Sequence, residues 1–158
     1  MMENKKDNPG IYIPPPLFYI AVFIAAVLIQ KWLPLNNAFF YTTTSKIIGP
    51  VIIFIGLFFN FPAIRQFFKT KNTLVTIKPA NSLQTTGIYS VSRNPMYVSL
   101  LLFYLGLSFL FGNWWNLILL PLLFLLVQEY VIKREEQYLH RRFGQQYLEY
   151  KAKVRRWM

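Results

Sequence analysis

The sequence of 158 residues contains no cysteine and only one histidine, His140. The absence of cysteine excludes disulfide bonds, zinc sites built on thiolates and a cysteine nucleophile. A single histidine excludes metal sites that need several imidazole ligands, so we predict no metal site. Charged residues are also scarce, since they make up 15% of the chain, compared with about 25% in an average soluble domain.

Apolar residues are abundant instead, at 54% of the chain, and they gather in four long stretches that contain few charges. A soluble domain of this length cannot bury so much contiguous apolar surface, so lipid is the expected solvent. We therefore predict an all-α fold, an integral membrane bundle of four transmembrane helices that forms a single domain over residues 1–158. The predicted spans are approximately residues 17–33, 47–61, 96–111 and 114–132.

The distribution of basic residues predicts how these spans are oriented. Lysine and arginine account for the formal net charge of +11, and they flank the apolar spans. This placement is typical of the cytosolic edge of a membrane protein, where it favours membrane lipids as partners, and we predict no nucleic-acid partner. Only Lys31 and Lys46 fall in the loops on the opposite side. Four spans with both termini in the cytoplasm, in a bacterial inner membrane, satisfy this asymmetry.

Two polar regions are predicted to meet on the cytoplasmic side. One is the loop before the third span, residues 72–97, and the other is a helical region over residues 133–158 that follows the fourth span. Apolar residues recur at helical spacing in the second region, and Gly144 is a candidate bend. This helix either lies on the lipid headgroups or packs over the loop, and the sequence leaves both arrangements open.

Each polar region contains a candidate for chemistry, although neither is specific alone. Pro95 suits the first turn of the third span, and the free N–H groups there, next to Arg93, favour an anionic group. The alternative interpretation of the same residues is a helix cap followed by a transmembrane helix, with an arginine whose charged end extends to the membrane surface. Glu135 and Glu136 point about 100° apart on a helix, so one can face inward while the other is solvated. A surface ion-pair cluster explains them equally well.

The order and spacing of these motifs resemble a known family. The loop reads Gly87-Ile-Tyr-Ser-Val-Ser-Arg-Asn-Pro-Met-Tyr97, and a helical hairpin follows it. The tail then reads Glu135-Glu136-x-x-Leu139-x-x-x-Phe143-Gly144-x-x-Tyr147-x-x-Tyr150. This pattern resembles the isoprenylcysteine carboxyl methyltransferase family, and the related phospholipid N-methyltransferases share much of it. The short N-terminal half is similar to that of the small bacterial members.

The resemblance implies a methyltransferase that uses S-adenosyl-L-methionine and releases S-adenosyl-L-homocysteine. The implied acceptor is a small lipophilic or lipid-linked molecule, with an isoprenylcysteine-like carboxylate or a phospholipid-like amine. The residues at matching positions are implied to bind the cofactor: Asn81, Ser82, Leu83, Gln84, Tyr89, Asn94, Pro95, Met96, Tyr97 and Glu135. Catalytic roles are predicted for Arg93, Arg134 and Glu136.

The sequence departs from the family pattern at two positions. Asn94 stands where eukaryotic members have histidine. Val131 stands where an arginine that binds the substrate carboxylate is expected, so Lys133 or Arg134 would have to replace that arginine. Two other functions stay open. One is an NAD(P)H-dependent membrane reductase of the sterol-reductase type, which has a similar loop, and the other is a non-catalytic membrane adaptor.

Overall fold

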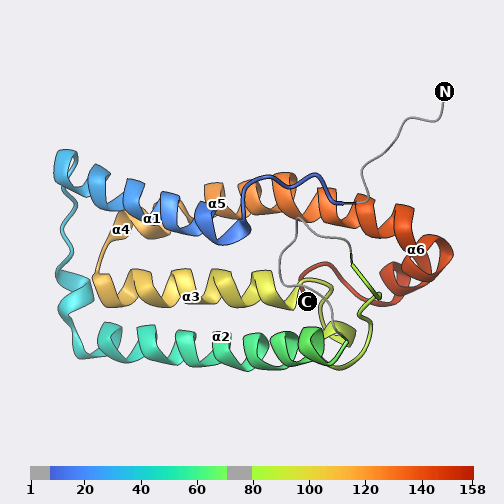
Figure 1. Ribbon diagram of the computed structural model, residues 1–158. Coiled ribbons are helices and arrows are strands. Elements are labelled where there is room, and N and C mark those ends of the chain that lie inside the picture. Colours follow the sequence, from blue (N-terminus) through green and yellow to red (C-terminus); the bar gives the residue numbers. More distant parts are fainter. Residues whose placement is uncertain (1–7, 71–79) are drawn as a thin grey trace.

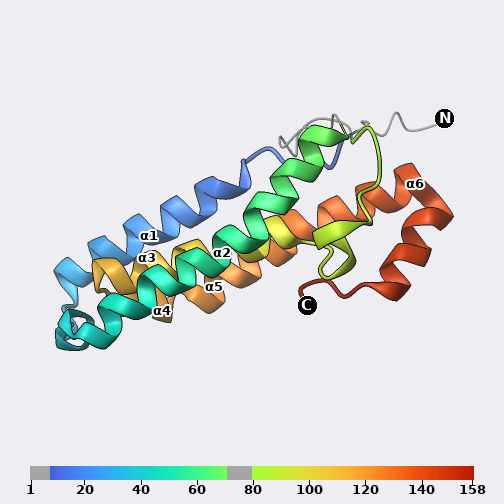
Figure 2. The ribbon, with the colours of Figure 1, turned by 90° about the horizontal axis from the view of Figure 1, so that it is seen from below.

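The computed structural model describes residues 8–70 and 80–158, and every regular element within these residues is helical. Three long helices lie side by side (Figures 1 and 2): α1 (Pro15–Trp32), α2 (Thr43–Lys69) and α3 (Pro95–Phe111). A fourth column lies beside α1 and consists of α4 (Trp114–Ile118), α5 (Leu120–Leu126) and the π-helical segment η3 (Val127–Ile132). The column continues into α6 (Lys133–Lys153), and two short 3-10 helices lie in the connections, η1 (Ala38–Tyr41) and η2 (Gly87–Ser90).

Two of these helices are long and apolar enough to cross a membrane. They are α1, with 18 residues, and α2, with 27, whereas α3 is apolar but has 17 residues. The hydrocarbon core of a bilayer needs about 20 helical residues. The prediction of an all-α fold is confirmed for the described residues. The first and last residues of α1 and α3 lie within two residues of the bounds of the predicted spans 17–33 and 96–111. The count of four spans stays a prediction.

The helix α2 extends well beyond the predicted span 47–61 at both ends. At its start, the side chain of Thr42 accepts a hydrogen bond of 3.3 Å from the Ser45 amide, which caps the helix. At its other end the helix continues through Pro62 to Lys69. Apolar length therefore identifies the middle of this helix, while the cap and the basic last turn lie outside the apolar stretch.

The predicted fourth span, residues 114–132, is not one regular helix. Asn113 caps α4 by accepting a hydrogen bond of 2.9 Å from the Trp115 amide. The helix is interrupted at Leu119 because Pro121, which has no N–H group, occupies the first turn of α5. The chain then widens into a π-helix at Val127 and runs directly into α6. The sequence therefore predicts the apolar column but not its interruption.

Glycine residues bring α2 and α3 into close contact. A Cβ atom added at Gly106 of α3 would lie 2.5 Å from Ile53 Cγ1 and 2.8 Å from the carbonyl oxygen of Gly49. One added at Gly56 of α2 would lie 2.8 Å from Cε1 of Phe103. These separations are shorter than van der Waals contact, so the backbones can approach only because side chains are absent. Close approach at small residues is how helices commonly associate in membranes.

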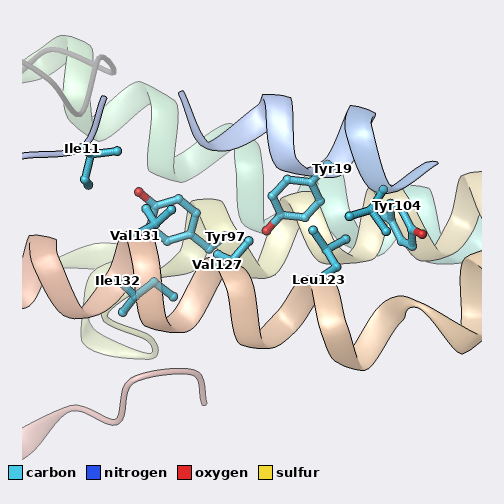
Figure 3. Packing of buried hydrophobic residues seen from close by; sticks show 9 residues of the cluster. Ile11, Tyr19, Tyr97, Tyr104, Leu123, Val127, Val131 and Ile132 are labelled. Atoms are coloured by element: carbon cyan, nitrogen blue, oxygen red, sulfur yellow. The ribbon is translucent and has the colours of Figure 1, made fainter. Parts of the chain in front are cut away.

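A cluster of buried side chains joins α1, α3 and the fourth column (Figure 3). Its members are Ile11, Tyr19, Val22, Tyr97, Tyr104, Leu123, Val127, Val131 and Ile132. The ring of Tyr97 is held in this cluster, and its hydroxyl points toward the end where Ile11 lies (Figure 3). Packing of the bundle therefore fixes the orientation of one tyrosine that faces the polar end of the molecule.

The polar segments collect at one end of the bundle (Figure 1). Gly144 has φ 50° and ψ −124° inside α6, which breaks the helix and turns its second half back toward the bundle (Figure 2). The predicted bend at Gly144 is confirmed. Because of this bend, the chain after α6 passes close to the start of α3, where the loop of residues 80–94 also lies. We call residues 80–94 the pre-α3 loop.

Candidate active site

A pocket of about 170 Å³ lies where the pre-α3 loop, the first turns of α3 and the first half of α6 converge. This volume accommodates on the order of ten water molecules, so a ligand of many atoms can enter. Eleven of the thirteen residues selected from the sequence line this bundle-end pocket: Ser82, Leu83, Gln84, Tyr89, Arg93, Asn94, Pro95, Met96, Tyr97, Glu135 and Glu136. The expectation that the two polar regions meet in space is therefore confirmed.

The backbone of the pre-α3 loop is held by local hydrogen bonds. Gly87 adopts φ +63°, a left-handed conformation that glycine adopts without strain, and it opens the 3-10 helix η2. Farther along, the Ser92 hydroxyl accepts a hydrogen bond of 3.1 Å from the Asn94 amide. Asn94 is the N-cap residue of α3, and Pro95 occupies the first turn of the helix. This geometry directs Tyr89, Asn94 and Pro95 toward the pocket.

The tail helix α6 packs over the loop, which is one of the two arrangements left open by the sequence. The Tyr150 hydroxyl donates a hydrogen bond of 2.6 Å to the Tyr89 carbonyl, and the Ala80 amide donates one of 2.9 Å to the Tyr138 hydroxyl. Tyr138, Tyr147 and Tyr150 are all buried and line the pocket. The helical spacing of Tyr147 and Tyr150 was visible in the sequence, whereas Tyr138 was not singled out.

Glu135 of α6 lines the pocket at the point where it contacts Tyr97 of α3. The Tyr97 hydroxyl donates a hydrogen bond of 2.9 Å to Glu135 Oε2. Burial raises the pKa of Glu135 to about 7; the hydrogen bond from Tyr97 opposes this shift, and the negative charge of Glu136 adds to it. Among residues 8–70 and 80–158, no lysine or arginine forms an ion pair with Glu135. The pocket therefore contains a shielded carboxyl group whose charge is not balanced by these residues.

This pKa predicts how stability depends on pH. The folded protein holds the Glu135 proton more tightly than the unfolded chain, where the pKa is near 4.5. The contribution of this group to stability is therefore complete below pH 4.5 and is lost as pH rises through about 7. Glu135→Gln cannot ionise, so it should gain about 3 kcal/mol relative to wild type between these limits. Unfolding in detergent at several pH values measures this difference, and parallel profiles would contradict the prediction.

Glu136 is buried among arginines rather than solvated. Arg156 binds it with two hydrogen bonds of 2.8 Å, and Arg93 Nη2 lies 3.1 Å from Glu136 Oε1. Burial alone would raise the pKa of Glu136, but the Arg156 hydrogen bonds and the charges of Arg93 and Arg156 outweigh burial and lower it. The expectation that one of the two glutamates is solvated is wrong, because the arginines supply the partners that let the second carboxylate be buried.

Arg93 connects Glu136 to the pocket. Its side chain is only 9% exposed, and Nη1 donates a hydrogen bond of 3.3 Å to the Tyr147 hydroxyl. Its Nε atom is buried without a hydrogen-bond partner among the residues that the structure describes. A buried donor without a partner is costly, so this atom is available to a ligand. Arg93 was selected from the sequence, whereas its pairing with Glu136 was not foreseen.

Two of the selected residues do not line the bundle-end pocket. Asn81 is exposed. Arg134 Nη1 donates a hydrogen bond of 3.0 Å to the Gly10 carbonyl, and its guanidinium lies 4.2 Å from the centre of the Tyr130 ring. Arg134 thus holds the segment before α1 near the pocket. Val131, where the resemblance places a substrate-binding arginine, is fully buried in the core.

Other residues that the sequence did not single out complete the pocket. Pro9, Pro15 and Pro16 line it from the segment before α1 and from the start of α1. Phe67 of α2 and Leu100 of α3 add further apolar surface. Residues 72–79 of the predicted cofactor loop lie outside the described residues. The pocket therefore combines a polar end near α6 with apolar walls supplied by the helices.

The fold and this pocket define a helical bundle of membrane type with a pocket at one end that is lined by acidic and aromatic side chains. The sequence matches the phospholipid methyltransferase family over residues 44–146, which is more than half of the chain. The chain therefore belongs to this family, and the resemblance inferred from the motifs is confirmed. The matched region contains the whole pre-α3 loop and the start of α6. Membership of this family implies that the protein is a membrane methyltransferase.

The other comparisons assign no activity. A protein of Haemophilus influenzae, described as uncharacterized, is 42% identical over 66 residues, which are 40% of this chain and 100% of that protein. No solved structure matches the chain.

Proposed function

We propose that the protein is an integral membrane methyltransferase that takes its methyl group from S-adenosyl-L-methionine and transfers it to a small lipophilic or lipid-linked acceptor. Membership of the phospholipid methyltransferase family supports the reaction class. The single observation that carries the proposal further is Glu135, a shielded carboxyl group in a pocket lined by tyrosines and without an ion-pair partner among the described residues.

The groups in the bundle-end pocket fit this cofactor, which carries a sulfonium, an ammonium and a carboxylate. Glu135 offers a carboxylate to cations or hydroxyl groups, and Tyr89 and Tyr97 offer aromatic faces that attract cations. Arg93 offers a buried N–H donor without a partner among the described residues, which suits an anionic group. Both signs of charge are thus matched within one pocket.

The protein's own residues act by positioning and by excluding water. The bound cofactor supplies an activated methyl group for direct displacement by a nucleophile on the acceptor. Such a displacement depends on alignment of the reacting atoms more than on acid–base catalysis. Packing holds the ring of Tyr97, and the same tyrosine orients Glu135. Pro15, Pro16 and Leu100 exclude water from the wall of the pocket nearest α1 and α3.

The acceptor class follows from the apolar walls. An acceptor with an alkyl or prenyl chain can lie against the helices while its reactive head reaches the polar end. Arg93 is proposed to lie between the anionic group of the cofactor and that head, and Glu136 acts only through Arg93 because both of its oxygens are bonded to arginine. For Arg134 we propose an indirect role, since it contacts the segment before α1.

The proposed topology has four spans in a bacterial inner membrane, with both termini and the pocket on the cytoplasmic side. The basic residues support it, because they flank the spans almost entirely on the side of the pocket. The breaks in the fourth column are compatible with a membrane, where neighbouring helices satisfy the freed backbone groups.

Transfer of a labelled methyl group tests the proposed function. Membranes that contain the protein should transfer label from S-adenosyl-L-methionine into a lipid-extractable product, and membranes without it should not. The Glu135→Gln variant, expressed to the same level, should lose most of this transfer. Absence of labelled product with a broad set of lipid amines and carboxylates would contradict the proposed acceptor class.

A further inference from the structure

The chain after α6 crosses back over the polar end of the bundle. It leaves the helix at Val154, whose φ of −121° and ψ of 131° are extended, and its last residues lie beside the start of α3 (Figure 1). We call residues 154–158 the strap. None of its residues lines the bundle-end pocket. The strap nevertheless contacts several residues that do.

Backbone carbonyls of the strap hold three consecutive residues of the pre-α3 loop. The Arg93 amide donates a hydrogen bond of 3.1 Å to the Arg155 carbonyl. The Arg156 carbonyl accepts two more, of 2.9 Å from Asn94 Nδ2 and 3.4 Å from the Ser92 hydroxyl. Arg93 and Asn94 line the pocket, and Asn94 is the N-cap residue of α3. The strap thus binds the part of the loop that sets the direction of these side chains.

The Arg156 side chain makes a second connection through Glu136. It binds both carboxylate oxygens at 2.8 Å, and one of these oxygens also receives Arg93 at 3.1 Å. A bidentate pair of this kind fixes the orientation as well as the separation of the two groups. Glu136 therefore links the strap to the guanidinium of Arg93, which reaches the pocket.

Trp157 fixes the strap on its far side. Its ring lies 4.7 Å from the ring of Phe124, measured between centroids, and its Nε1 donates a hydrogen bond of 3.2 Å to Gln128 Oε1. Phe124 belongs to α5 and Gln128 to η3. The strap is therefore attached to the helical column at one point and to the loop at another.

We propose that Arg156 is a positioning residue of this enzyme: through the Arg156 carbonyl and the Glu136 carboxylate, the strap holds the pre-α3 loop and Arg93 in the conformation that binds the cofactor. This role rests on the proposed function, since it assigns the loop to the cofactor. It adds to that function a residue outside the pocket on which cofactor affinity depends.

Calorimetric titration of the detergent-solubilised full chain with S-adenosyl-L-homocysteine tests the role. Arg156→Ala should raise the Kd by about 10- to 100-fold, the usual effect of removing a residue that orients a binding group, while the number of sites per chain stays unchanged. Arg156→Lys keeps the charge and should recover part of the affinity. Arg155→Ala is the matched control, because that side chain is exposed and its backbone carbonyl is retained.

The outcomes separate positioning from folding. Fewer binding sites at the wild-type Kd would mean that Arg156 only supports folding, and this would overturn the proposal, as would an unchanged Kd. Hydrogen exchange of ligand-free protein adds a readout that is independent of the cofactor, because Arg156→Ala should speed exchange of the Arg93 amide. If wild type fails to bind S-adenosyl-L-homocysteine while this exchange still depends on Arg156, the proposed function fails and the strap's hold on the loop stands.

Discussion

Replacing Glu135 with glutamine is expected to weaken binding of S-adenosyl-L-homocysteine by about 100-fold. This value lies toward the upper end of the affinity change that follows loss of a hydrogen bond to a charged group. The substitution keeps the shape of the side chain and its contact with Tyr97, but it removes the carboxylate. In the described residues that carboxylate has no basic partner, so a bound ligand is the group that depends on it.

Glu129→Gln is the matched control for this substitution. Glu129 is also an interfacial glutamate, but its side chain is 50% exposed and paired with Lys133 outside the pocket. Exposed pairs of this kind contribute about 0–1 kcal/mol, so affinity should stay at the wild-type value. Equal losses in the two variants would mean that general surface charge, not the pocket, determines binding.

Gly106→Ala is expected to lower the stability of the helix bundle by about 1–3 kcal/mol, the usual cost of forcing an extra methyl group into a packed site. The new Cβ atom would lie 2.5 Å from Ile53 Cγ1 and 2.8 Å from the Gly49 carbonyl oxygen. The second contact is to backbone, which cannot move away as a side chain can. The helices α2 and α3 would have to separate, and α3 carries Tyr97 into the pocket.

Thermal unfolding in one detergent measures this effect, and a change of this size lowers the Tm by about 5 °C. Leu107→Ala is the control, because Leu107 is the next residue on α3 and is 38% exposed. Its loss should leave the Tm within about 2 °C of wild type. A Gly106→Ala protein with an unchanged Tm would contradict the close packing of α2 and α3.

Local sequence signals account for much of the fold. Pro95 in the first turn of α3 and the apolar stretches of α1 and α3 were sufficient to predict the bounds of both helices to within two residues. The interruption at Leu119 was missed because the span was predicted from apolar length alone, although Pro121 lies inside it and lacks the N–H group that a continuous helix needs. Apolar length identifies which residues form a span but does not determine where its hydrogen bonds break.

The site could be predicted only where its motifs are local. The resemblance assigned the consecutive residues Asn94 to Tyr97 and the distant Glu135 to the cofactor, while the predicted topology brought the two polar regions to the same side. The pairing of Glu136 with Arg156 could not be foreseen, since it needs the bend at Gly144 to bring a residue 20 positions later back to α6. Arg134 was selected as a replacement for the substrate-binding arginine that the resemblance places at Val131, but its contact with Gly10 depends on the segment before α1.

The central claim is that the bundle-end pocket binds the methyl-donor cofactor. Titration of wild-type protein with S-adenosyl-L-homocysteine, beside an identical titration with NADPH, tests it most directly. We expect saturable binding of one S-adenosyl-L-homocysteine per chain, weakened about 100-fold in Glu135→Gln, and no saturable binding of NADPH. Binding of NADPH alone, or S-adenosyl-L-homocysteine binding that Glu135→Gln leaves unchanged, would contradict it.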